Sequence, residues 1–136
     1  TGGQTVAPGY AEGTLIGGNL TALSYLFGTT YMPELSGKIL LLEDIGGKSF
    51  WIDLRLQQLR QTPGFDKLQG IIFGEFSDCA IIDKEDGSPD EIIDTFCQNL
   101  TIPVIKHFPY GHIPARHILP VGLPVKLNAD DCSVRF

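Results

Sequence analysis

Short apolar runs alternate with stretches of helical spacing through the middle of the chain. The apolar runs predict buried strands at 38–42 and 70–73, and we expect further short strands at 11–16 and 102–105. Apolar residues at helical spacing predict helices at 20–27, 50–61 and 89–100. Short extended segments at 120–127 and 132–136 close the chain. This order predicts an α/β fold with a mixed sheet that curls toward a barrel and carries flanking helices.

Several polar and glycine residues mark the predicted boundaries. Gly28 is expected to end the first helix as a left-handed cap, and Ser49 to be the N-cap of the second. The segment Ser88-Pro89-Asp90-Glu91 has capping-box spacing with proline at the first helical position. Residues 1–10 are rich in glycine and proline, and we expect them to form a linker or interdomain arm. Residues 11–136 then form one domain.

Composition and charge argue against several classes of protein. A net charge of -6 without a basic patch argues against a nucleic-acid partner, and the apolar runs are too short to span a membrane. Three widely spaced cysteines (Cys79, Cys97 and Cys132) predict reduced thiols, a cytoplasmic protein and no structural zinc site. No cofactor is expected. The chain begins at Thr1 without a signal sequence, so we expect a fragment of a longer protein that lacks its N-terminal domain.

Acidic residues follow two of the predicted buried strands. Glu43 and Asp44 come directly after the run at 39–42, and Glu75 follows the run at 70–73. The carboxyl ends of such strands are where α/β proteins place their chemistry. Glu43 and Asp44 face opposite sides of an extended chain, so only one of them can face a site. The alternative for each acid is a solvent-facing position at a strand end.

His112 follows the loop residues Pro109-Tyr110-Gly111. A histidine and a strand-end carboxylate are two members of a hydrolytic triad, in which the carboxylate orients the imidazole. His107 and His117 each lie five residues from His112, a spacing that does not converge on a strand or a helix, so no metal site is expected. His117 is interpreted as a surface or edge histidine.

Gly17, Gly18 and Asn19 precede the first predicted helix. Free backbone N–H groups there favour binding of an anionic part of a substrate, and the alternative is that Asn19 is only an N-cap. No Gly-x-Ser-x-Gly elbow is present, so no nucleophilic serine is predicted. Acidic neighbours are expected to raise the thiol pKa of Cys79 and make it unreactive.

Eight blocks of the chain, in this order, resemble the LD-carboxypeptidases, a family of serine peptidases that includes muramoyltetrapeptide carboxypeptidases and microcin C immunity proteins. The blocks are 13–20, 28–29, 39–44, 52–53, 58–59, 70–74, Tyr110-Gly111-His112 and 119–122. They span about residues 11–128, nearly the whole chain. The resemblance implies the C-terminal domain of a two-domain enzyme, with a barrel-like α/β sheet. Departures at Gly47-Lys48 and Asp53-Leu54 lie outside the triad positions and concern fine substrate contacts.

The resemblance also implies roles for individual residues. Glu43 and His112 match the triad glutamate and histidine, while the protein's own N-terminal domain would supply the serine. The substrate implied is a murein tetrapeptide, which loses its terminal D-alanine in peptidoglycan recycling, and the isolated domain would be inactive. The alternatives are a microcin C immunity-type peptidase, or a non-catalytic binding domain in which both residues are structural. Trp51 is interpreted as helix core, not as an adenine-stacking residue, and a homodimer is one partner arrangement considered.

Overall fold

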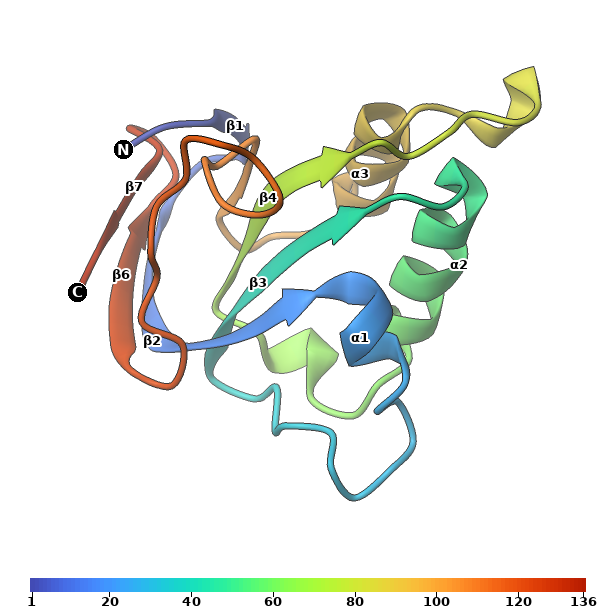
Figure 1. The fold of residues 1–136 in the computed structure, drawn as a ribbon. Coiled ribbons are helices and arrows are strands. Elements are labelled where there is room, and N and C mark those ends of the chain that lie inside the picture. Colours follow the sequence, from blue (N-terminus) through green and yellow to red (C-terminus); the bar gives the residue numbers. More distant parts are fainter.

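Seven strands form one curled sheet in the order β1-β5-β4-β3-β2-β6-β7 in the computed structural model, which describes residues 1–136 (Figure 1). The strands are β1 (Gln4–Ala7), β2 (Tyr10–Asn19), β3 (Lys38–Ile45), β4 (Gly70–Ser77), β5 (Val104–Lys106), β6 (Pro124–Asn128) and β7 (Ser133–Arg135). The helices are α1 (Leu20–Ser24), α2 (Ser49–Arg60) and α3 (Pro89–Cys97), with 3-10 turns η1 (Phe65–Lys67) and η2 (Lys84–Asp86).

The four central strands, β2 to β5, are parallel, and the outer strands are antiparallel to their neighbours. Parallel strands need crossover connections, which α1, α2 and α3 provide. Because such strands are covered on both faces, β3 and β4 read as continuous apolar runs instead of alternating patterns. The predicted mixed α/β sheet with flanking helices is therefore confirmed.

Two apolar clusters cover the two faces of the sheet. One cluster of 17 buried residues joins the helices to one face, and another of 10 lies inside the curl. Phe108, which follows β5, belongs to the inner cluster. The sheet's opposite margins approach each other, since Gly2 N donates to the Cys132 carbonyl at 3.1 Å and Thr5 Oγ1 of β1 donates to the Ala129 carbonyl at 2.5 Å. None of the helices has both the length and the apolar character needed to cross a bilayer.

Element ends differ from the predictions at several places. Residues 1–10 contain strand β1, which was not predicted; the role of this segment as an interdomain arm stays a prediction. Helix α1 stops at Ser24, four residues before the left-handed Gly28, and α3 stops at Cys97 instead of residue 100. The capping box of α3 is confirmed, because the Ser88 hydroxyl accepts from Glu91 N and the Glu91 carboxylate accepts from Ser88 N.

Two further predictions, both about helix α2, are wrong. Its N-cap is Lys48, while Ser49 is the first helical residue and is fully buried with an unbonded hydroxyl. Trp51 is 44% exposed and its ring faces the Arg55 guanidinium, so it is not a core residue. The buried face of α2 is set by Ile52, Leu56 and Leu59, and Trp51 is rotated away from that face by about 100°, one residue's turn of the helix.

Candidate active site

Glu43 lies near the C-terminal end of β3 and contacts His112 from the loop after β5. The Glu43 side chain is only 5% exposed, and its Oε2 lies 2.9 Å from His112 Nδ1. Its second oxygen, Oε1, accepts a hydrogen bond from Asn19 Nδ2 at 3.2 Å. The structure thus brings together two residues that lie 69 positions apart in the sequence.

The free side of the His112 ring faces an open pocket. The His112 side chain is 53% exposed and its Nε2 has no hydrogen-bond partner in the structure. A pocket of about 370 Å³ is lined by Glu43, Tyr110, Gly111, His112, Arg116, His117, Ile118 and Leu119. Because Glu43 accepts at Nδ1, that nitrogen carries the proton and leaves the Nε2 lone pair available. This arrangement can accept a proton from a nucleophile placed in the pocket.

Two glycines allow the His112 loop to approach the sheet this closely. Gly111 has φ +123°, and a Cβ there would lie 3.0 Å from Glu43 Oε2. A Cβ on Gly74 of β4 would lie 2.5 Å from the Tyr110 carbonyl oxygen. That carbonyl accepts from Glu75 N at 2.9 Å, which fastens the loop to β4. Sequence reasoning missed the role of Gly74, since nothing local indicates which strand the loop packs against.

Asp44, the competing carboxylate, points away from His112. It accepts from Thr21 Oγ1 at 2.7 Å, from Asn19 Nδ2 at 3.0 Å and from the backbone N–H of Ile45. Asp44 therefore connects β3 to the start of α1. Glu75, the third candidate, bonds to His107 and not to His112.

Asn19 spans both strand-end carboxylates. Its Nδ2 donates to Glu43 and Asp44, and its Oδ1 accepts from Ala22 N at 2.9 Å. Asn19 is thus the N-cap of α1 and also an orienting partner of Glu43. The second role has a detectable origin, because Asn19 and Glu43 are register partners in the parallel β2–β3 pair.

The two glycines before Asn19 differ from each other. A Cβ on Gly17 would overlap the Leu41 carbonyl oxygen, so the close approach of β2 to β3 accounts for this residue. Gly18, at φ +141°, has open space above it. Helix α1 is only five residues long, and Asn19 already caps it. Substrate contact by Gly17, Gly18 and Asn19 stays a prediction.

The remaining candidate residues have structural environments. His117 Nε2 lies 3.4 Å from the Thr1 carbonyl at the surface, and the ring lies against Phe108. Burial raises the thiol pKa of Cys79, and the charges of Asp44 and Asp78 raise it further. The predicted direction is correct, but burial contributes more than the acidic neighbours. Burial also raises the pKa of Cys97 to about 12.

Comparison with known proteins identifies the family. Residues 12–127 match the family model described as the LD-carboxypeptidase C-terminal domain. The chain belongs to the LD-carboxypeptidase family. A putative carboxypeptidase of Synechocystis is 32% identical over 98% of this chain and 45% of its own length. A crystal structure of muramoyltetrapeptide carboxypeptidase from Oxalobacter formigenes matches 93% of this chain and 44% of that chain, with 33% identity and a TM-score of 0.82.

The microcin C7 self-immunity protein MccF, in complex with aspartyl sulfamoyl adenosine, is also similar. It matches 97% of this LD-carboxypeptidase chain and 39% of its own, with 29% identity and a TM-score of 0.81. The chain therefore spans less than half the length of each of these relatives. Both kinds of relative share the curled sheet, so the fold alone does not separate their substrates.

Proposed function

We propose that this chain is the C-terminal domain of a serine LD-carboxypeptidase, in which Glu43 and His112 form a Ser-Glu-His triad with a serine from an N-terminal domain. The observation that carries the proposal is the 2.9 Å contact between buried Glu43 and His112, with Nε2 free at an open pocket. The same order of carboxylate, imidazole Nδ1, free Nε2 and nucleophile defines hydrolytic triads on unrelated folds.

The mechanism follows from this geometry. His112 Nε2 takes the proton of the serine hydroxyl as the serine oxygen attacks the carbonyl of the diamino acid that precedes the terminal D-alanine. Glu43 holds the Nδ1–H tautomer and stabilises the imidazolium that forms. His112 then returns the proton to the leaving amine, and D-alanine departs. A water molecule, deprotonated by His112, hydrolyses the acyl-enzyme and restores the serine.

The substrate proposed is the murein tetrapeptide, processed in the cytoplasm during peptidoglycan recycling. Support comes from relatives named for muramoyltetrapeptide and murein peptide cleavage, each about 30% identical over most of this chain. The second candidate is a microcin-type immunity peptidase, which the similarity to MccF favours. Trp51 gives that candidate no support, because it lies on α2 and does not line the pocket beside His112.

The deciding experiment uses the longer protein that joins this chain to its N-terminal domain. We expect D-alanine release from murein tetrapeptide, and a loss of at least about 10³-fold in kcat/KM for Glu43→Gln and His112→Ala. Glu85→Gln, which removes a carboxylate charge at an exposed position outside this pocket, is the matched control and should retain activity within about threefold. The isolated chain should release no D-alanine.

Two other outcomes are informative. Full activity of both variants would contradict the triad and favour a binding domain in which Glu43 and His112 are structural. Faster turnover of an aminoacyl sulfamoyl adenylate than of the tetrapeptide would favour the immunity-type peptidase.

A further inference from the structure

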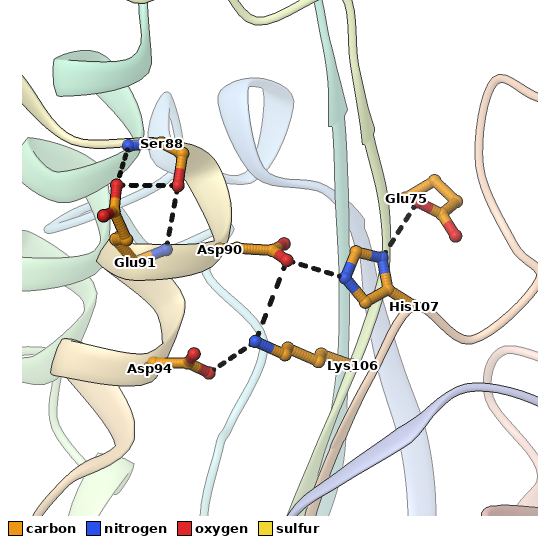
Figure 2. A network of polar contacts seen from close by, with 7 residues as sticks. All are labelled: Glu75, Ser88, Asp90, Glu91, Asp94, Lys106 and His107. Atoms are coloured by element: carbon orange, nitrogen blue, oxygen red, sulfur yellow. Dashed lines mark hydrogen bonds and ion pairs between the residues drawn. The ribbon is translucent and has the colours of Figure 1, made fainter.

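A second polar cluster lies where the C-terminal ends of β4 and β5 meet helix α3 (Figure 2). The His107 ring is held between two carboxylates, with Nδ1 3.2 Å from Glu75 Oε2 of β4 and Nε2 3.0 Å from Asp90 Oδ2 of α3. Beside it, the buried Lys106 places Nζ 2.7 Å from Asp94 Oδ1 and 3.9 Å from Asp90 Oδ2. Each charged group in the cluster thus has a partner within the cluster, which favours a structural connection over a ligand site.

The cluster is connected to the loop that carries His112. Glu75 contacts that loop twice: its backbone N–H donates to the Tyr110 carbonyl at 2.9 Å, and its carboxylate bonds to His107. His107 is the residue immediately before Phe108, whose N–H donates to the Phe73 carbonyl at 3.0 Å. Asp90 therefore connects helix α3, through His107 and Glu75, to a point two residues before His112.

The backbone at His107 is also unusual. Its φ is +54°, a left-handed conformation that is uncommon for any residue other than glycine. A glycine would adopt it without strain but would have no side chain to bridge Glu75 and Asp90. Such strain persists only where surrounding contacts impose it, and here the two carboxylates provide those contacts.

We propose that His107 is a positioning residue, which holds the His112 loop in place by bridging Glu75 of β4 to Asp90 of α3. This role presupposes that Glu43 and His112 act as proposed above. His107 itself does not line the pocket beside His112, so it acts through the loop and not on the substrate.

The bridge depends on the charge of the imidazole. Both ring nitrogens face carboxylate oxygens, so both must carry a proton for the bridge to be complete. Burial lowers the His107 pKa, but the hydrogen bonds to Asp90 and Glu75 and their negative charges outweigh it, and the pKa is raised above its usual value. The other charged groups here are Lys106 and Asp94, and Lys106 pairs with Asp94 at 2.7 Å and lies 3.9 Å from Asp90. As pH rises through the raised pKa, the bridge loses one donor and the loop becomes more mobile.

The test uses NMR on this 136-residue chain, because loop order can be measured there without any turnover. Backbone order parameters of Gly111 and His112 are measured from pH 6 to pH 9, and ring carbon shifts give separate midpoints for His107 and His112. In the wild type we expect order parameters near 0.85 at pH 6 that fall below about 0.6 as His107 loses its proton. In His107→Gln and His107→Gly we expect values below about 0.6 throughout.

Glu91→Gln is the matched control, since it removes a charge from the first turn of α3, keeps an acceptor for Ser88 N and leaves both contacts of His107 in place. It should behave as the wild type. His107→Gly separates positioning from stability, because glycine relieves the strained backbone while removing the bridge; loop order should fall even where the unfolding midpoint is unchanged.

Wild-type order in the two His107 variants would overturn the proposal, as would a wild-type transition that follows the His112 midpoint. If His107→Gln does not fold, the wild-type titration and His107→Gly still decide. Failure of the triad itself would instead appear as unchanged D-alanine release in the Glu43 and His112 variants of the longer protein.

Discussion

The Glu43 carboxylate lies against Gly111, at the place where a side chain on residue 111 would begin. A Cβ on residue 111 would lie 3.0 Å from Glu43 Oε2 and 3.3 Å from Glu43 Cβ, at a φ of +123°. Gly111→Ala should therefore displace the loop and lengthen the Glu43–His112 contact. We expect an activity loss of about 10²-fold in the longer protein, as misplacement of catalytic groups by about 1 Å can cause.

The same substitution should cost about 1–3 kcal/mol of unfolding free energy, the usual magnitude for an imposed backbone strain. Gly122→Ala is the matched control, because Gly122 has a positive φ but open space around its Cβ position. It should lose a similar amount of stability in urea unfolding and little activity. Equal activity losses in the two variants would show that the close approach of Gly111 to Glu43 is unimportant.

Asn19 offers a second test, because one amide group serves two buried carboxylates. Asn19→Ala leaves Glu43 Oε1 without its donor, which should cost about 1–3 kcal/mol, whereas Asp44 keeps its bonds from Thr21 and Ile45. It also removes the N-cap of α1, worth about 1 kcal/mol, so we expect a total loss of about 2–4 kcal/mol. Asn19→Asp should cost more at pH 7, because it places a third carboxylate beside the other two, and the excess should shrink toward pH 4 as one of them is protonated.

Urea unfolding at the two pH values measures both effects. The control for the charge change is Gln69→Glu, at an exposed position, where we expect a change within about 0.5 kcal/mol. A loss for Asn19→Asp that does not depend on pH would contradict the electrostatic account.

The sequence predicted the central sheet well because β3 and β4 are covered on both faces, which leaves continuous apolar runs. It missed β1 because the pairing of Gln4 with Lys106 joins segments about a hundred residues apart, and the local glycines and proline indicate a loop. Helix α1 was predicted too long for a related reason. Apolar residues continue past Ser24, but they lie in turns, and their side chains pack against the larger core cluster.

The candidate site, like the fold, was predicted from the sequence only in part. Strand-end position and loop chemistry suggested a pair of His112 with Glu43, Asp44 or Glu75, and only the family resemblance selected Glu43, which lies 69 positions from His112. The choice of Glu43 over Asp44 follows from which side of β3 each faces, and the sequence left that open. The His107 bridge could not be predicted, because it depends on the packing of α3 against β4 and β5.

The raised pKa of His107 predicts a pH-dependent contribution to stability. Burial opposes protonation, yet the hydrogen bonds and charges of Asp90 and Glu75 raise the folded-state pKa above the unfolded value. The bridge therefore stabilises the folded state fully below the unfolded pKa of about 6.5, and that contribution is lost as pH rises through the folded pKa. We expect wild type to exceed His107→Gln in unfolding free energy at pH 6 by more than at pH 8.5.

Other titrating groups cancel in this difference between two proteins, and the measurement is urea unfolding at both pH values. Glu91→Gln should show no comparable change in its difference from wild type, because Glu91 bonds to Ser88 and not to His107. A difference in unfolding free energy between wild type and His107→Gln that stays constant with pH would contradict a bridge that depends on the charge of His107.

Two serines at helix N-termini should respond oppositely to replacement by alanine. Ser88 caps α3 with reciprocal bonds to Glu91, so Ser88→Ala should cost about 1 kcal/mol. Ser49 looks equivalent in the sequence, but it is the first helical residue of α2 and not its N-cap, and its buried hydroxyl has no hydrogen-bond partner. Ser49→Ala removes an unsatisfied polar group and should leave stability unchanged or raise it by up to about 1 kcal/mol. A loss for Ser49→Ala as large as that for Ser88→Ala, in parallel urea titrations, would show that the Ser49 hydroxyl is a cap after all.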